Sequence, residues 1–182
     1  MCSSDLTVAT NAVLERKGAR TALITTAGFE DVLEIGRQTR RELYNLDVTR
    51  PAPLVPSDRR FGISERILHD GSVEKPLNDK EARSLAMRLK QEGIESVAVS
   101  LLFSFVDPSH ERRISDALRE HGFSVSLSCD ILPEYREYER TSTTVVNAYV
   151  APIMHRYLTE LSHALPRCSL RVMQSKIGRA HV

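Results

Sequence analysis

The side chains best suited to chemistry lie in one stretch of this 182-residue chain, from Arg136 to Tyr149. It begins with the run Arg-Glu-Tyr-Glu-Arg and continues with four hydroxyl-bearing residues, Thr141 to Thr144. Hydroxyls at the start of a helix could face a phosphate, because the backbone N–H groups there already favour anions. The alternative is that these hydroxyls only cap and decorate the helix, and on residue types alone we favour that interpretation.

The two arginines of this stretch, Arg136 and Arg140, could each bind a carboxylate or phosphate through two parallel hydrogen bonds. Because Glu137 and Glu139 stand beside them, a structural ion-pair network accounts for the same residues equally well. Cys129 follows a predicted strand and could act as a nucleophile, but a single half-buried thiol is more often a packed side chain.

No known catalytic motif stands elsewhere in the chain: a nucleophile elbow, a zinc-protease helix, a Cys-x-x-Cys pair and a P-loop are all absent from the sequence. The histidines are scattered, so the sequence predicts surface side chains rather than metal ligands, and no metal-binding residue is assigned. Five of the six are His69, His110, His121, His155 and His163; the sixth, His181, lies near the C-terminal end.

Composition excludes several classes of protein. The net charge of +1 gives no footprint for nucleic acid or for an anionic membrane, and no apolar run is long enough to span a bilayer. Three widely spaced cysteines form neither a disulfide framework nor a zinc site. With no visible signal peptide, we expect a cytoplasmic protein.

Hydrophobic patterning predicts an α/β fold. In the first half we expect helices and strands bounded by glycines, then an irregular proline-bearing segment, then a hairpin that turns at Asp70-Gly71. The predicted elements are a helix over Thr7–Lys17 stopped by Gly18, a strand over Arg20–Thr26, a short helix over Glu30–Ile35, the irregular segment Arg37–Pro56, and hairpin arms Phe61–Leu68 and Ser72–Lys75.

In the second half, a strand, a helix and a strand follow in order, which predicts a parallel pair joined by a right-handed crossover. The elements are a helix from Asn78 or Asp79 to Glu92, a doubly buried strand over Glu95–Phe103, a helix from Asp107-Pro108 to Gly122, a strand over Phe123–Ser128, and a partial strand over Leu170–Met173.

A long helix is expected from the charged run to about Leu165, and Pro152 should kink it or start a second helix. Apolar residues recur along it at helical spacing, which predicts a buried stripe. This stripe consists of Val146, Val150, Ile153, Tyr157, Leu161 and Leu165.

The two ends of the sequence have an unusual relation. Suitable codons for Ile177–Val182 are the reverse complement of a stretch that encodes Met1–Asp5 when read from GTG. We therefore expect residues 1–6 and 176–182 to be non-native, derived from a sequencing adapter. Finding both ends encoded at the genomic locus would contradict this.

Four stretches together resemble the hydantoinase/oxoprolinase family, which includes N-methylhydantoinase A, 5-oxoprolinase and a related component of acetone carboxylase. They follow the family's order along nearly all of the chain. They are Thr7–Ala12 with Leu14–Ala19, Thr25–Arg37, Leu102–Phe105 with His110–Arg113, and Leu132–Thr144 running into Asn147–Tyr149.

The resemblance implies an incomplete lobe of an actin-like ATPase, which is a ribonuclease-H-like α/β fold. It implies ATP-dependent hydrolysis of a cyclic amide through a phosphorylated intermediate, with Mg²⁺ neutralising the phosphate charge. It also implies a second hydantoinase subunit or a homo-oligomer as partner. Its candidate site residues for nucleotide or substrate are Thr7, Thr10 and Asn11, followed by Arg136, Glu139, Arg140 and Thr143; no catalytic residue is assigned.

The sequence departs from the family pattern at two loops. The opening phosphate loop, of the D-x-G-G-T type, is absent before Thr7, and the Q-S-N-G-G segment begins as Gln174-Ser175 and is not continued. We therefore expect residues 7–146 to be the family's N-terminal domain without its first strands, and residues 147–175 to begin the next domain. Such a fragment should be inactive alone. A carboxylase subunit of the acetone carboxylase type, or a non-catalytic assembly module, remains the alternative.

Overall fold

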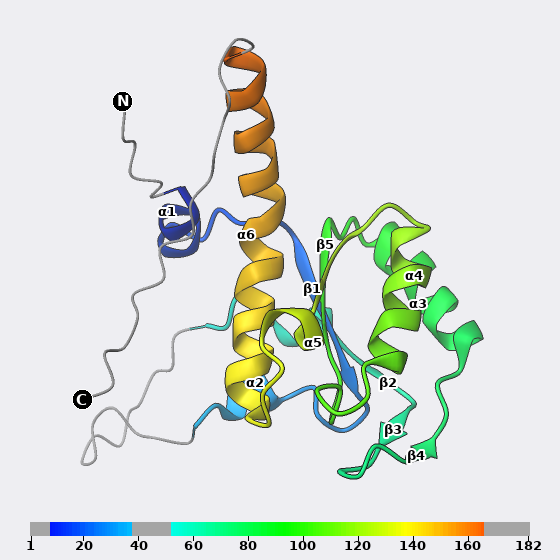
Figure 1. Ribbon diagram of the computed structural model, residues 1–182. Helices are drawn as coiled ribbons and strands as arrows, with labels where there is room; N and C mark the ends of the chain where they lie inside the picture. Colours follow the sequence, from blue (N-terminus) through cyan, green and yellow to red (C-terminus); the bar gives the residue numbers. More distant parts are fainter. Residues whose placement is uncertain (1–7, 38–51, 166–182) are drawn as a thin grey trace, which may run out of the picture.

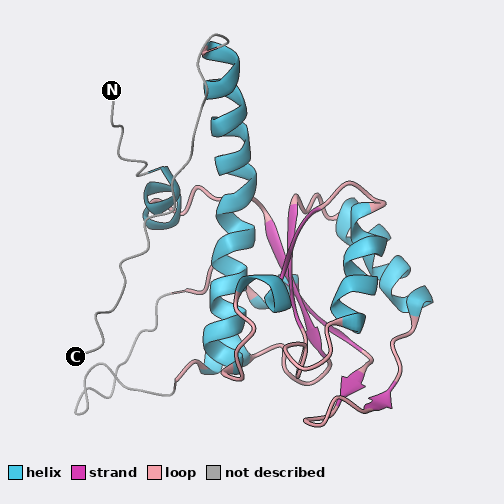
Figure 2. Cartoon of the chain, in the orientation of Figure 1, coloured by secondary structure: helices cyan, strands magenta, loops and turns pink. Residues whose placement is uncertain are grey.

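The structure is a computed structural model that describes residues 8–37 and 52–165. A four-stranded parallel sheet with strand order β2-β1-β5-β6 lies between two layers of helices (Figures 1 and 2). α3 and α4 cover one face, and α1, α2 and α6 lie on the other (Figure 1). The strands are β1 (Thr21–Thr26), β2 (Arg60–Ile63), β5 (Ser96–Ser100) and β6 (Ser124–Leu127); the helices are α1 (Val8–Leu14), α2 (Val32–Ile35), α3 (Asp79–Gln91), α4 (Ser109–Arg119), α5 (Ser128–Ile131) and α6 (Glu137–Ala164).

β1 is rich in β-branched residues, and β5 alternates valine with small residues, which favours extended strands; every residue of both strands is buried. This confirms the prediction of a strand buried on both faces. β6 pairs with β5 in parallel after α4, as expected for a strand-helix-strand unit. Asn78 caps α3, since its side chain accepts a hydrogen bond from the N–H of Lys80 at 3.1 Å.

The predicted hairpin is only partly correct. Its expected first arm splits: β2 joins the main sheet beside β1, and only β3 (Arg66–Ile67) pairs with β4 (Val73–Lys75). The turn at Asp70-Gly71 is present, with the N–H of Leu68 bonded to the carbonyl of Ser72 at 2.9 Å. β2 leaves the hairpin because Phe61 and Ile63 bury their side chains in the main core.

The first helix ends earlier than its glycine suggests. Arg16 takes a left-handed conformation (φ 54°), and the N–H of Lys17 bonds to the carbonyl of Ala12 at 2.9 Å, which is a Schellman ending built on an arginine. Gly18 has a different role. A Cβ added there would lie 1.9 Å from the ring of Tyr149, so the glycine permits this close approach.

The face that α6 buries differs from the predicted stripe. Val146 and Leu165 are exposed, and the other members of the stripe are only partly buried. The helix is continuous through Pro152, so a second helix does not begin there. The side chains that it buries are Arg140, Thr141, Thr144, Val145, Ala148 and Tyr149.

None of the helices among the described residues is long and apolar enough to cross a membrane. The predicted strand over Leu170–Met173, most of the proline-bearing segment Arg37–Pro56, and Thr7 lie outside the described residues.

Candidate functional site

The carboxyl ends of the parallel strands carry most of the buried polar side chains. β1 lies where the order of the sheet reverses, because the chain passes from β1 to β2 on one side and returns to β5 on the other. In open α/β sheets, ligands bind outside the carboxyl ends of the strands at such a point. Thr26, Ser100 and Leu127 end three of these strands, so this edge is the candidate functional site.

A buried arginine organises one part of this edge. Arg140 is 1% exposed, and its Nη1 donates to Ser104 Oγ at 2.5 Å and to Ser128 Oγ at 3.3 Å. Its guanidinium stacks on Phe105, 5.5 Å from the ring centre, while its buried Nε has no hydrogen-bond partner. Burial lowers the pKa of Arg140, and the nearby Glu111 opposes that shift.

Glu111 connects the arginine to the ends of two strands. Its carboxylate is fully buried and accepts hydrogen bonds from the N–H of Leu101, the N–H of Cys129 and the hydroxyl of Ser128. Ser128 therefore bridges Glu111 and Arg140, with its hydroxyl 2.6 Å from the Glu111 carboxylate. We call Ser104, Glu111, Ser128 and Arg140 the buried polar network.

Burial also decides the chemistry of Cys129. Desolvation, followed by the charge of Glu111, raises the pKa of its thiol to about 12. A thiol with this pKa stays protonated at neutral pH, and the thiolate is the nucleophilic form. The structure thus favours the packed role for Cys129 over the nucleophilic one.

A second buried group stands beside β1. The Nδ1 of His110 lies 2.7 Å from one carboxylate oxygen of Glu65, and Thr26 donates to the other at 2.5 Å. His110 is 3% exposed, so the prediction of a surface histidine is wrong for this residue. It is buried because it begins α4 directly above the end of β1, where Glu65 supplies a partner.

The charged run at the start of α6 does not form the expected internal network. Glu139 pairs with Arg37 at 2.8 Å, and Arg136 lies over the ring of Tyr135 at 5.9 Å and points to solvent. A backbone hydrogen bond at the helix start, with Arg37 adding to it, lowers the pKa of Glu139. Only Arg140 enters the buried polar network.

The hydroxyl cluster bonds mainly to the protein itself. Thr141 lies 2.8 Å from Ser100, Ser142 donates to the carbonyl of Glu139, and Thr144 donates to the carbonyl of Arg140. Thr143 is exposed. The structural interpretation of this cluster is therefore the better one, although no side chain caps α6.

The other candidate residues lie away from this edge. Thr10 and Asn11 are exposed on α1, and the segment after α1 meets α6 at Tyr149, about 14 Å along the helix axis from Arg140. The structure thus brings together Arg140 with Glu139 and Arg136 nearby, but it does not bring Thr10 or Asn11 to them.

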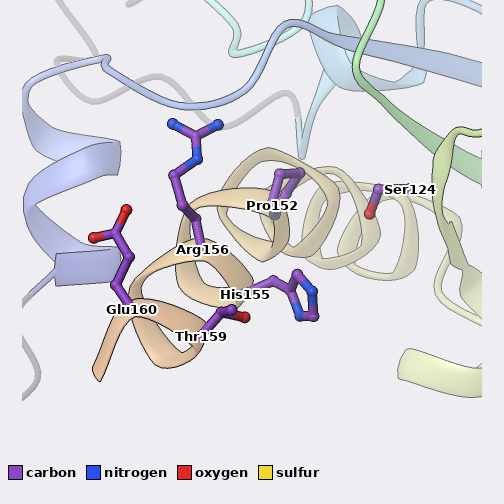
Figure 3. Close-up of a pocket in the computed structure, with 6 residues that line it drawn as sticks. All are labelled: Ser124, Pro152, His155, Arg156, Thr159 and Glu160. Atoms are coloured by element: carbon purple, nitrogen blue, oxygen red, sulfur yellow. The ribbon is translucent and has the colours of Figure 1, made fainter. Parts of the chain in front are cut away.

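A surface depression lies at the opposite, amino-terminal edge of the sheet (Figure 3). Ser124 contributes from the start of β6, and α6 contributes the rest: Pro152, His155, Arg156, Thr159 and Glu160. Glu160 projects toward α1 and Arg156 toward the segment that follows it, whereas His155 lies on the side of Ser124 (Figure 3). The depression shares no residue with the buried polar network, so it is not the candidate site.

The described residues do not fit a magnesium–nucleotide site on their own. Arg140 is buried against two serines, and the hydroxyls beside it are bonded internally. Among residues 8–37 and 52–165, no three His, Cys, Asp or Glu side chains are grouped so as to hold a metal ion. The edge is thus a rigid polar support rather than a complete phosphate cradle.

Sequence reasoning missed Glu65, Ser104, Glu111 and Ser128. Two signals were available: Glu111 follows the Asp107-Pro108 helix start, while Ser104 directly follows the predicted buried strand over Glu95–Phe103 and Ser128 ends the predicted strand over Phe123–Ser128. Polar residues just after such strands gather at one edge of a parallel sheet. No sequence pattern near Glu65 or His110 predicts that these two residues pair.

Comparison with known proteins identifies the family. Residues 3–122 match the family described as hydantoinase/oxoprolinase N-terminal region. An uncharacterized protein of Methanocaldococcus jannaschii is 40% identical over 88% of this chain and 25% of its own length. The alpha subunit of the caprolactamase of Pseudomonas jessenii is 36% identical over 88% of this chain and 24% of its own length.

Two solved structures share the fold. The crystal structure of ATP-dependent caprolactamase from Pseudomonas jessenii matches with a TM-score of 0.82 at 35% identity, over 91% of this chain and 25% of that one. A nucleotide-free acetone carboxylase structure matches with a TM-score of 0.76 at 31% identity, over 87% and 24%. The chain spans about a quarter of the length of these proteins. With its parallel sheet and long helix, the chain has the predicted α/β fold of actin-like ATPase type, and it belongs to the hydantoinase/oxoprolinase family.

Proposed function

We propose that this chain is part of a longer ATP-dependent enzyme that hydrolyses a cyclic amide, such as a hydantoin or 5-oxoproline ring, after activating it by phosphorylation. The observation that carries the proposal is the match to ATP-dependent caprolactamase, with a TM-score of 0.82 at 35% identity. Caprolactam is itself a cyclic amide, so one type of bond would be cleaved in both enzymes. A second, different subunit or another copy would be its partner, because the related caprolactamase chain is named as the alpha subunit of its enzyme.

We further propose that residues 7–146 correspond to the family's N-terminal domain and residues 147–175 to the start of the next, with non-native residues at both ends. The chain alone would then lack the loops that hold ATP and Mg²⁺. The geometry supports this, because Thr10 and Asn11 lie far from Arg140, and Arg140 is already bonded to two serines. Bound ATP would supply the phosphoryl group, and the buried polar network would keep the nearby strand ends in place.

Calorimetric binding of Mg-ATP tests this proposal. The segment 7–175 should show no binding, whereas the same segment extended to its full genomic reading frame should bind. Binding by the short segment would contradict the assignment of the nucleotide site to other loops. In that case, Thr10→Ala with Asn11→Ala, compared with Arg136→Ala at the other edge, would locate the site among the residues present.

A carboxylase subunit is the second candidate, and the match to acetone carboxylase at a TM-score of 0.76 favours it. Turnover by the extended protein distinguishes the two. ATP hydrolysis stimulated by a cyclic amide supports the hydrolase, and stimulation by a ketone with bicarbonate supports the carboxylase. If neither compound stimulates hydrolysis but a partner protein binds, a non-catalytic assembly module is the better description.

A further inference from the structure

The long helix α6 consists of two halves with different surroundings. All of its fully buried residues lie between Arg140 and Tyr149, and from Val150 onward every residue is partly or fully exposed. With 28 residues the helix is about 42 Å long, about two to three times the length of the strands beneath it. Figure 1 shows the second half of α6 extending beyond the sheet. We call residues 137–149 the inner half and residues 153–164 the outer half.

Pro152 stands where the two halves meet. It has no N–H to donate to the carbonyl of Ala148, and its ring crowds that carbonyl. Sharp bends in long helices occur mainly at such positions. Pro152 therefore removes a helical hydrogen bond at the point where support by the sheet ends.

The inner half is fixed immediately before the proline. The N–H of Ala19 donates to the carbonyl of Tyr149 at 3.0 Å, and Gly18 lies against the ring of Tyr149. Asn147 donates to Ser126 of β6 at 2.9 Å. These contacts come from β6 and from the segment that leads into β1, and they hold the last turn of the inner half to the sheet.

The outer half has no comparable polar attachment. Within the part of the chain that the structure describes, no side chain from Val150 to Leu165 forms a hydrogen bond or an ion pair with another element. The short helix α1 packs against α6 near the junction, and Glu160 of the outer half projects toward it (Figures 1 and 3). The inner half is thus bonded to the sheet, whereas the outer half is supported by packing against α1 without such hydrogen bonds.

We propose that Pro152 is a hinge about which the outer half of α6 turns as a rigid rod relative to the sheet and the inner half. The inference concerns the chain itself and does not depend on the proposed ATP-dependent activity. It gives the lobe a built-in point of movement relative to anything attached to the outer half.

Distances between paired spin labels test the hinge, in the full chain with its three cysteines replaced by serine. One label at the exposed Asp116 of α4 is paired with a label at Ser162 in the outer half, or with one at Thr143 in the inner half. The distance distribution to Ser162 should be at least about twofold wider than that to Thr143. In Pro152→Ala the Asp116–Ser162 distribution should become as narrow as the Asp116–Thr143 distribution, because alanine restores the missing N–H and suits a helix interior. Ala151→Ser, which keeps the proline, should leave the Asp116–Ser162 distribution broad.

Fraying of the helix end would also broaden the outer distance, so a third pair separates the two explanations. Labels at His155 and Ser162 both lie on the exposed surface of the outer half. If the outer half is a rigid rod, the distances between these two labels should have a narrow distribution, as measured by dipolar broadening. Three results would each overturn the proposal. They are a broad distance distribution for the His155–Ser162 pair, an Asp116–Ser162 distribution as narrow as the Asp116–Thr143 one, and an Asp116–Ser162 distribution that stays equally broad in Pro152→Ala.

Discussion

The two faces of the central sheet are held to their helices by different forces. Among residues 8–37 and 52–165, sixteen buried apolar residues form one cluster on the face covered by α3 and α4, including Ile24, Val97, Val99 and Leu118. On the face covered by α6 the corresponding cluster has five, centred on Leu23 and Ala98. The same strands supply both faces, because alternate residues point to opposite sides.

Hydrogen bonds replace apolar burial on the α6 face. Ser100 bonds to Thr141, Ser126 accepts from Asn147, and the buried polar network binds Arg140 at the strand ends. Burial of apolar surface is not directional, whereas a buried hydrogen bond requires a defined geometry. The α3 and α4 face thus supplies most of the stability, and the α6 face fixes the position of one helix relative to the candidate site.

The largest expected effect comes from removing the carboxylate that joins the two faces. Glu111→Ala should lower the free energy of unfolding by about 3–5 kcal/mol, because three donors lose their acceptor and the buried Arg140 loses the nearby negative charge. Urea unfolding followed by circular dichroism measures this. Asp116→Ala, at an exposed position of the same helix, is the control and should change stability by less than about 0.5 kcal/mol. Equal losses of unfolding free energy from the two substitutions would show that the buried polar network does not stabilise the carboxyl ends of the strands.

A cavity on the apolar face should have the next largest effect. Leu118 is 1% exposed in the α3 and α4 cluster, so Leu118→Ala should cost about 2–5 kcal/mol. The same urea experiment applies, with Met87→Ala as the control, since Met87 is 53% exposed on α3. A loss below about 1 kcal/mol for Leu118→Ala would mean that this face is not the main source of stability.

A larger side chain beneath α6 tests the difference between the two faces of the sheet more directly. Ala98 is fully buried beneath α6, and Ala98→Leu should cost about 1–3 kcal/mol by pushing the helix from the sheet. Hydrogen exchange should rise in α6 while α3 and α4 keep their protection. Val97→Leu, on the next residue and the opposite face, is the matched control and should leave exchange in α6 unchanged. If Ala98→Leu increased hydrogen exchange in α3 and α4 as well as in α6, the two faces would not be held independently.

The contrast between the faces also explains what the sequence could predict. The strand predicted over Glu95–Phe103 and the helix capped by Asn78 follow from local patterns. Both are present, although the strand spans only Ser96–Ser100 because the chain turns at Phe103, which has a φ of 54°. The buried stripe of α6 was predicted wrongly because hydrophobic periodicity assumes an apolar partner. α6 instead packs on Ala98, Ser100 and Ser126. Thr141, Thr144 and Arg140 are therefore buried, and Val146 is exposed.

The candidate site was predictable only in part for a similar reason. Arg140 stood out through the charged run in which it lies, but its partners Ser104 and Ser128 are 36 and 12 residues away. Glu65 and His110 are 45 residues apart. Such pairs depend on the order of strands in the sheet, and neither composition nor helical spacing encodes that order.

The smallest expected effect tests whether a single hydrogen bond positions α6. Ser100→Ala leaves the buried Thr141 hydroxyl without its partner and should cost about 0.5–1.5 kcal/mol. Thr141→Val removes the other hydroxyl with almost no change in shape and should cost a similar amount. The double variant should be less destabilised than the sum of the two, because replacing both partners leaves no unpaired buried group. A strictly additive result from the same urea experiment would mean that the two hydroxyls do not interact, and that other contacts hold the inner half of α6.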